Sequence, residues 1–353
     1  MTAVKLRGIQ NLQVERAPVP KIGNDEILVK VHCGFICGTD LRMYKNGHSH
    51  AELDNGLVLG HEIAGIVAEV GRSVGQYREG MRVSVDPNMG CGVCNRCVSG
   101  HTQLCGELQA LGINIDGGFA EYIRIPREAV LQGNVAVIPD HVSFEEAALA
   151  EPLSCVLNAA ERCRTQPGDV VLVIGAGPIG MMHGRVQRML GAGTIIVHDL
   201  NEQRLVSCHE RNPDFTVVGE HELDQVILQH TDGRGADVCV VAAPSPEAQQ
   251  RGLELLGING RLMLFGGLPK DREVVPFNSN LIHYKQLIVT GTTRQNLRQY
   301  RTCIDLIARG KLGVKDIVTH VFNLADAPEA FEQAIAGIGL KLGFSISGDA
   351  ASG

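Results

Sequence analysis

The sequence predicts an α/β protein of two domains, a small antiparallel β-barrel followed by a doubly wound parallel sheet. Short runs that alternate apolar and polar residues, separated by glycine-rich turns, fill residues 4–85 and are typical of antiparallel strands. From residue 167 onward, continuous apolar runs alternate with helical stretches, which is the pattern of a parallel sheet covered on both faces. A chain of 353 residues with 44% hydrophobic content can supply two cores.

The elements follow from these patterns in chain order. In the first domain, expected at residues 1–154, strands are predicted at 27–31, 63–70, 81–85 and 118–123, with a cysteine-containing loop at 88–108 between the last two. The second domain is expected at 155–291. Its six predicted strands lie at 170–174, 194–197, 215–218, 238–242, 262–265 and 287–289. Residues 292–353 carry a predicted helix at 300–308 and a strand at 340–346, and we expect this segment to return to the first domain.

Composition excludes several classes of partner. The net charge of -7 argues against nucleic acid and anionic membrane surfaces, and the absence of Trp with only 4% aromatic residues argues against base-stacking platforms. The longest nearly apolar run, residues 170–182, is too short to cross a bilayer. The N-terminal residues lack the basic and apolar regions of a signal peptide. We therefore expect a cytoplasmic protein that binds neither nucleic acid nor membrane.

Cys37, His61 and Glu62 offer a thiolate, an imidazole and a carboxylate within a short region bracketed by glycines. Zinc favours this mixture of ligands, and a catalytic site keeps one coordination position open. A lone His-Glu pair is usually just solvated. Here the pair stands in the pattern Gly-His-Glu-x2-Gly-x5-Gly-x2-Val, residues 60–74, and we interpret it as part of a catalytic zinc site.

Four further cysteines predict a second, structural zinc site. Two consecutive C-x2-C steps bring three cysteines together, and the chain returns with a fourth. Four sulfurs fill every coordination position of a tetrahedral zinc ion, as in a structural site. A disulfide pair or a redox centre is the alternative, but disulfides fit poorly with a cytosolic chain and a redox motif needs only two cysteines. The four are Cys91, Cys94, Cys97 and Cys105.

A dinucleotide fingerprint opens the second domain. Gly175, Gly177 and Gly180 form G-x-G-x-x-G directly after an apolar strand and before a helical pattern, so that the helix N-terminus would face a pyrophosphate. Asp199 follows at the end of the next strand, where an acid accepts hydrogen bonds from ribose hydroxyls and repels a 2′-phosphate. An ordinary turn residue is the alternative for Asp199. The combination predicts NAD in preference to NADP.

The chain resembles the zinc-dependent medium-chain alcohol dehydrogenases over nearly its whole length, and within them the polyol dehydrogenases (sorbitol-like and sugar-alcohol-phosphate members). The motif Cys37-Gly38-Thr39-Asp40 and the glycine-bracketed His61 and Glu62 carry this resemblance. It implies a GroES-like catalytic domain, an NAD-binding Rossmann domain and two zinc ions per chain. It also implies that Thr39 heads a proton relay and that Glu151 lies at the metal, directly or through water. By the same resemblance Arg294 reaches substrate hydroxyls, and the NAD-binding positions are Ile179, Asp199, Arg204, Phe265, Gly266, Gly267, Thr292, Thr293 and Arg294.

The expected reaction is oxidation of a secondary alcohol. Zinc would lower the pKa of the hydroxyl, Thr39 would accept its proton, and the carbon would transfer hydride to NAD. Many relatives have a histidine relay residue where this chain has Arg42, a poor proton shuttle, so the relay would end in water or use His48 or His50. Alternatively, Arg42 could contact a phosphate of cofactor or substrate.

Several alternatives stay open. Either Glu62 or Glu151 could be the carboxylate ligand. The substrate could be L-threonine or another secondary alcohol instead of a polyol or sugar alcohol, phosphorylated or not. A non-catalytic zinc protein that senses NAD is a more remote possibility. The family habit is a homodimer or a homotetramer.

Overall fold

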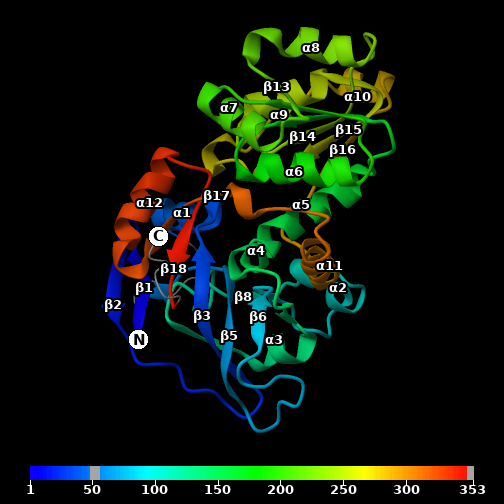
Figure 1. Ribbon diagram of the computed structural model, residues 1–353. Coiled ribbons are helices and arrows are strands. Elements are labelled where there is room, and N and C mark those ends of the chain that lie inside the picture. The colour runs from blue at the N-terminus through cyan, green and yellow to red at the C-terminus, as the bar shows by residue number, and fades with distance from the viewer. Residues whose placement is uncertain (48–55, 348–353) are drawn as a thin grey trace. The chain divides into compact units, whose positions relative to one another are not determined.

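The chain divides after Ser154 and again after Arg294, which gives unit 1 (Met1–Ser154 with Gln295–Gly353) and unit 2 (Cys155–Arg294). The predicted second boundary lies three residues earlier, after residue 291. The computed structural model describes residues 1–47 and 56–347 (Figure 1). Among these residues no helix is both long and apolar enough to span a membrane.

Unit 1 is built on mostly antiparallel sheets. Its largest sheet runs β10-β6-β5-β3-β18-β17, with β9 also paired to β3, and a smaller one runs β2-β1-β4. β7 and β8 form a short ribbon. The strands are β1 (Thr2–Gly8), β2 (Asn11–Arg16), β3 (Ile27–Phe35), β4 (Leu57–Val58), β5 (Glu62–Val70), β6 (Arg82–Val85), β7 (Asn88–Met89), β8 (Gln109–Ala110), β9 (Tyr122–Ile125), β10 (Val135–Val137), β17 (Val318–Asn323) and β18 (Lys341–Ser345).

The helices of unit 1 are α1 (Gly38–Asn46), α2 (Asn95–Val98), α3 (Arg127–Gln132), α4 (Phe144–Ala148), α11 (Leu297–Ala308) and α12 (Ala327–Ala336). The long α5 (Ala150–Cys163) begins in unit 1 and continues into unit 2.

The returning segment completes the unit 1 sheet, because β18 pairs antiparallel with β3 in the register Gly343↔Phe35 (Figure 1). Its core includes an aromatic cluster in which the rings of Phe119 and Phe344 meet edge to face at 4.9 Å between centroids.

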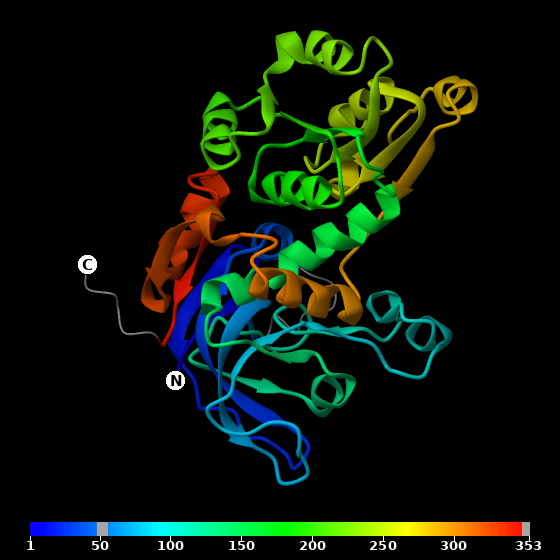
Figure 2. The ribbon, with the colours of Figure 1, turned by 45° about the vertical axis from the view of Figure 1, so that its right-hand side comes forward.

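Unit 2 is a six-stranded parallel sheet in the order β13-β12-β11-β14-β15-β16, with helices on both faces (Figure 2). Numbered from its first strand, this order is 3-2-1-4-5-6, which places a topological switch point between β11 and β14. Its elements are β11 (Val170–Ile174), α6 (Pro178–Met189), β12 (Thr194–His198), α7 (Glu202–Arg211), β13 (Thr216–Val218), α8 (Leu223–His230), β14 (Ala236–Val241), α9 (Pro246–Glu254), β15 (Leu256–Leu264), α10 (Ser279–Tyr284) and β16 (Ile288–Gly291).

The predicted fold class is confirmed, with one notable difference in extent. β15 begins at Leu256, six residues before the predicted strand at 262–265. Its first half contains Gly257, Asn259 and Gly260, a composition that resembles a turn. Asn259 indeed adopts a left-handed φ of 60°, and the register against β14 shifts at this irregularity.

Candidate functional site

Three of the predicted zinc ligands come together inside unit 1. Cys37 directly precedes α1, while His61 and Glu62 stand at the start of β5. Their ligand atoms all lie within 4.8 Å of one another. His61 is 4% exposed and Glu62 is completely buried, so the group is largely withdrawn from water.

The side chain of Asp40 fixes the loops that carry these ligands. This completely buried carboxylate accepts a hydrogen bond from the Cys37 backbone N–H at 2.8 Å and one from the Gly60 N–H at 3.4 Å. Its Oδ1 also lies 3.6 Å from His61 Nδ1. Asp40 was recognised in the sequence only as part of a motif, and its positioning role is apparent from the structure.

Gly60 is required by the packing behind the site. Its φ is +93°, and a Cβ built at this position would lie 2.3 Å from the Phe119 ring. A side chain here would therefore displace the aromatic cluster and, with it, the neighbouring His61.

An ion pair that the sequence did not predict neutralises Glu62. Lys341 of β18 places Nζ 2.6 Å from Glu62 Oε1, and both side chains are buried. Burial raises the pKa of Glu62, against the lowering influence of the Lys341 ammonium. Burial alone would lower the pKa of Lys341, but the Glu62 carboxylate raises it overall. The sequence feature that could have pointed to this ion pair is a lysine in the otherwise apolar stretch 340–344.

The residues present fit a zinc ion. His61 Nδ1 and Glu62 Oε2 are buried and lack hydrogen-bond partners among the described residues, which is unusual for buried polar atoms. An ion bound beside Cys37 would satisfy such atoms. Burial alone lowers the pKa of His61, but Asp40 and Cys37 raise it well above its usual range, so a metal at this imidazole would compete with a proton.

Glu151 lies outside this group of three ligands. It stands in the first turn of α5, is 6% exposed, and its Oε1 accepts a hydrogen bond from Gln295 Nε2 at 3.1 Å. Burial raises the pKa of Glu151 and the charge of His61 lowers it, so the two side chains interact electrostatically. Gln295 was not singled out in the sequence.

The head of the predicted proton relay contacts an arginine. Arg42 Nη2 donates a hydrogen bond to Thr39 Oγ1 at 3.2 Å, and Arg42 is exposed. The alternative relay residues His48 and His50 lie outside the described residues. Because a guanidinium carries no acceptor atom, Arg42 cannot take a proton from Thr39.

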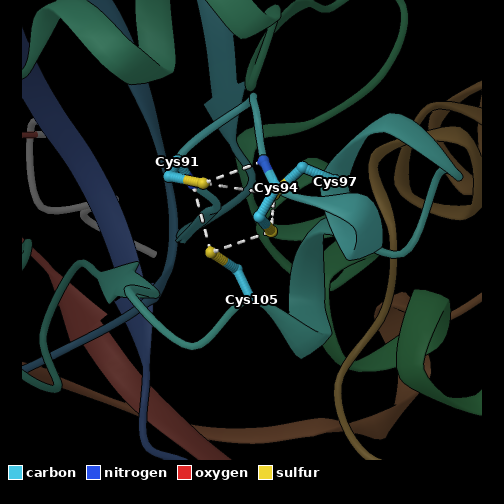
Figure 3. A group of neighbouring side chains, drawn as sticks. All are labelled: Cys91, Cys94, Cys97 and Cys105. Carbon is cyan, nitrogen blue, oxygen red and sulfur yellow. Dashed lines mark hydrogen bonds between the residues drawn. The ribbon is translucent and has the colours of Figure 1, made fainter.

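The sulfurs of the four-cysteine loop point toward one another (Figure 3). Cys94 Sγ lies 3.5 Å from Cys97 Sγ and 3.9 Å from Cys105 Sγ, and Cys91 Sγ lies 4.0 Å from Cys97 Sγ. With zinc–sulfur bonds of about 2.3 Å, a tetrahedral site has sulfur–sulfur edges of about 3.8 Å. The loop is therefore already close to the geometry of a structural zinc site.

In unit 2, the fingerprint turn is attached to the end of the neighbouring strand. Gly175 has φ +117° and donates its N–H to the carbonyl of His198 at 2.7 Å. Ala176 N–H donates to Asp199 Oδ2 at 2.8 Å. A Cβ on Gly180 would lie 1.7 Å from the Gly175 carbonyl oxygen, so only glycine lets α6 start this close to the turn.

The other predicted cofactor residues belong to the same unit, and several follow the carboxyl ends of its parallel strands. Arg204 Nη1 lies 4.0 Å from Asp199 Oδ2. Asn158, which the sequence analysis did not identify, donates to Thr292 Oγ1 at 2.6 Å and to the Arg294 carbonyl at 2.7 Å. The remaining positions are Gly177 and Ile179 at the start of α6, Phe265, Gly266 and Gly267 after β15, and Thr293 after β16.

Two family models match the chain. Residues 23–140 match the alcohol dehydrogenase GroES-like domain. Residues 178–309 match the zinc-binding dehydrogenase model. The first match contains seven of the eight residues that we singled out as zinc ligands, all but Glu151, and the second contains α6 and Asp199.

Individual relatives are similar over almost their full length. Sorbitol dehydrogenase of Bacillus subtilis is 36% identical over 338 residues, which are 95% of this chain and 94% of that protein. L-threonine 3-dehydrogenase of Pyrococcus furiosus is 35% identical over 335 residues, 93% of each chain. Among solved structures, an Escherichia coli CFT073 protein described as a short chain alcohol dehydrogenase complexed with NADH has a TM-score of 0.87 and 26% identity, and covers 98% of this chain and 99% of its own.

Proposed function

The chain belongs to the family of zinc-binding dehydrogenases with an alcohol dehydrogenase GroES-like domain, and from this premise we propose that it oxidises a secondary alcohol of a polyol or sugar alcohol with NAD. The observation that carries the proposal is the group of the half-buried Cys37 and the buried His61 and Glu62, in which two buried polar atoms lack hydrogen-bond partners among the described residues. A thiol, an imidazole and a carboxylate clustered in this way suit a metal that acts as a Lewis acid.

In the proposed mechanism, Cys37 and His61 would hold the catalytic zinc together with a carboxylate, from Glu62 or from Glu151. When bound, zinc lowers the pKa of an alcohol and NAD accepts the hydride. Thr39 Oγ1 accepts the alcohol proton. Since Arg42 already donates to that oxygen and has no acceptor, Thr39 releases a proton to water and not to residue 42.

Cofactor binding is assigned to unit 2. The N-terminus of α6, opened by Gly175 and Gly177, would hold the pyrophosphate through its backbone N–H groups. Asp199 would accept hydrogen bonds from the ribose hydroxyls of NAD, and its negative charge would repel the 2′-phosphate of NADP.

The similarity to polyol dehydrogenases favours a polyhydroxylated substrate, because the relative at 36% identity is named a sorbitol dehydrogenase. L-threonine is the second candidate, because a relative at 35% identity is named L-threonine 3-dehydrogenase. By resemblance to sorbitol-like dehydrogenases, Arg294 would contact the hydroxyls of a polyol substrate.

A substrate panel tests this proposal. Zinc-loaded enzyme is incubated with NAD or NADP and with sorbitol, xylitol, galactitol 1-phosphate, L-threonine or 2,3-butanediol, and the absorbance of reduced nicotinamide is followed. We expect NAD to be reduced with an unphosphorylated or a phosphorylated polyol. Turnover of L-threonine alone would select the second candidate. Cofactor binding without reduction of any substrate would contradict catalysis and favour an NAD sensor.

We also infer that the chain assembles as a homodimer through the edge of the unit 2 sheet. β16 ends the strand order and, among the described residues, pairs only with β15. Ile288 of this strand is 47% exposed, and Val274 and Tyr284 nearby in the sequence are also exposed. An open, partly apolar edge favours pairing with a second copy.

The four unbridged ligand cysteines support a reducing compartment such as the cytoplasm.

Light scattering after size-exclusion chromatography measures the assembly. The wild-type chain is expected at the mass of a dimer. An Ile288→Lys variant is expected to shift toward the monomer, because burial in the interface would strip the lysine ammonium of its hydration and destabilise the dimer. A tetramer that Ile288→Lys reduces to dimers would place β16 at one of two interfaces. A wild-type monomer would contradict the inference.

A further inference from the structure

We propose that Gln295 and Asp86 are positioning residues that hold the carboxylate of Glu151 in its working orientation. The observation is a buried amide that bridges two buried acids. Gln295 Nε2 donates to Glu151 Oε1 and to Asp86 Oδ1, each at 3.1 Å. The inference rests on the proposed function, because it assigns a working role to Glu151.

The bridge defines the orientation of the amide. Gln295 is completely buried, and both partners of its Nε2 are carboxylate oxygens. A primary amide nitrogen has two protons, one for each of these acceptors, whereas the amide oxygen in this place would face two negative groups. The interaction thus engages one named oxygen of Glu151 and leaves the other, Oε2, outside this bond.

Asp86 gives the bridge a rigid base. It directly follows β6 and is 1% exposed, and its Oδ1 also accepts the Asn88 backbone N–H at 3.1 Å. Its backbone is held on both sides by Asn134, since the Asp86 N–H donates to the Asn134 carbonyl at 2.9 Å and Asn134 Nδ2 donates to the Asp86 carbonyl at 3.1 Å. Movement of Gln295 would therefore break bonds to a fixed strand end.

The charges of the two acids explain why an amide stands between them. Burial, and to a smaller extent the charge of Glu151, raise the pKa of Asp86 to about 7, against the lowering effect of the hydrogen bonds from Asn88 and Gln295. Burial also raises the pKa of Glu151, which the Gln295 hydrogen bond lowers. A neutral donor shared by both acids separates their oxygens while stabilising the ionised form of each. The Glu151 carboxylate is therefore held in one orientation, in which it can accept a hydrogen bond from a molecule bound to zinc or from a substrate hydroxyl.

A double-mutant cycle tests the positioning role. Gln295→Met removes the amide at similar size, Asp86→Asn removes the charge at the same shape, and Glu151→Gln removes the acid that they would position. Loss of the groups that orient a metal-site residue typically costs about 10- to 100-fold in activity. We expect such a loss of kcat for Gln295→Met, with an unchanged KM for NAD. In the Glu151→Gln background, Gln295→Met should cost less than about 2-fold further, because residues that act through one group are not additive.

The matched control is Gln187→Met, which removes another completely buried glutamine amide, in α6 of unit 2, where it contacts Thr165 and not an acid. It should keep kcat within about 2-fold of the wild type. A second readout does not depend on turnover. With Co²⁺ in place of zinc, the visible spectrum of the catalytic site should change in Gln295→Met and in Asp86→Asn but not in Gln187→Met. Melting temperatures identify any variant that fails to fold, and Asp86→Asn then carries the test because its shape is unchanged.

The outcomes separate this inference from the proposed function. If Glu151→Gln keeps full activity, Glu151 has no role at the metal or the substrate, and the positioning role of Gln295 and Asp86 is wrong as well. The proposed polyol oxidation is tested separately by the substrate panel. The positioning role alone is overturned if Glu151→Gln loses activity but Gln295→Met costs as much in that background as in the wild type, or if the cobalt spectrum of Gln295→Met is unchanged.

Discussion

A Cys37→Ala variant should retain one of its two zinc ions and lose about 10³-fold or more of its polyol oxidation rate. Lewis-acid stabilisation by a metal is worth several kcal/mol, and each 1.36 kcal/mol corresponds to a factor of about ten in rate. Cys37 supplies the thiolate among the three clustered ligands, and alanine offers no replacement donor. The four-cysteine loop is untouched and should keep its ion. Metal analysis of the purified variant together with kcat measures both effects.

Cys33→Ala is the matched control. Cys33 is a buried cysteine of β3 and is not part of either ligand group among the described residues. Its alanine variant should retain two zinc ions and an oxidation rate within a few-fold of the wild type. If Cys37→Ala still bound two zinc ions, or if the wild-type enzyme kept its full rate after removal of the catalytic metal, the proposed site would be wrong.

Lys341→Met should lower the free energy of unfolding by about 3–5 kcal/mol, because removal of one partner of a buried ion pair leaves a buried charge uncompensated. Glu62 is completely buried and its Oε1 faces the Lys341 ammonium at 2.6 Å. Burial raises the folded-state pKa of Glu62 to about 7 even beside Lys341. Below that pH the carboxyl is protonated in both folded proteins, so the loss should be small. It should grow as the pH rises above about 7, where Glu62 ionises beside Lys341 in the wild type but has no cation in the variant. Urea unfolding of metal-free protein at several pH values measures this dependence.

The double variant Glu62→Gln/Lys341→Met isolates the cause. With both charges gone, most of the lost stability should return, because paired polar groups can be replaced together at little cost. Lys311→Met removes an exposed lysine and should change stability by less than about 0.5 kcal/mol. A double variant as unstable as Lys341→Met alone would show that packing of the lysine stem, and not its charge, is responsible.

Local spacing in the sequence was sufficient to predict the fold class and the main ligand groups. Cys91, Cys94, Cys97 and Cys105 lie within one loop, so their spacing limits how far apart their sulfurs can be. The same holds for the turn from Gly175 to Gly180, whose context between strand and helix defines its geometry. The assigned roles of these residues in binding stay predictions.

Contacts between distant segments could not be predicted in this way. Lys341 is 279 residues from Glu62, and Gln295 is 144 residues from Glu151. No periodicity links such positions, because their approach depends on how β18 pairs with β3 and on how the segment before α11 reaches α5 and the end of β6. A buried amide such as Gln295 also carries no motif, and only its two acidic partners reveal a role.

The position of Lys341 in β18 has a consequence for biogenesis. A chain still emerging from the ribosome presents Cys37, His61 and Glu62 long before Lys341 has been synthesised, and domains tend to fold in the order of synthesis. Until β18 docks beside β3, the Glu62 carboxylate has no cation to balance it in the interior. Completion of this ion pair therefore waits until residue 341 has been made and β18 has paired with β3, and a frameshift that spares the first 340 residues would still yield a polypeptide in which Glu62 lacks its cation.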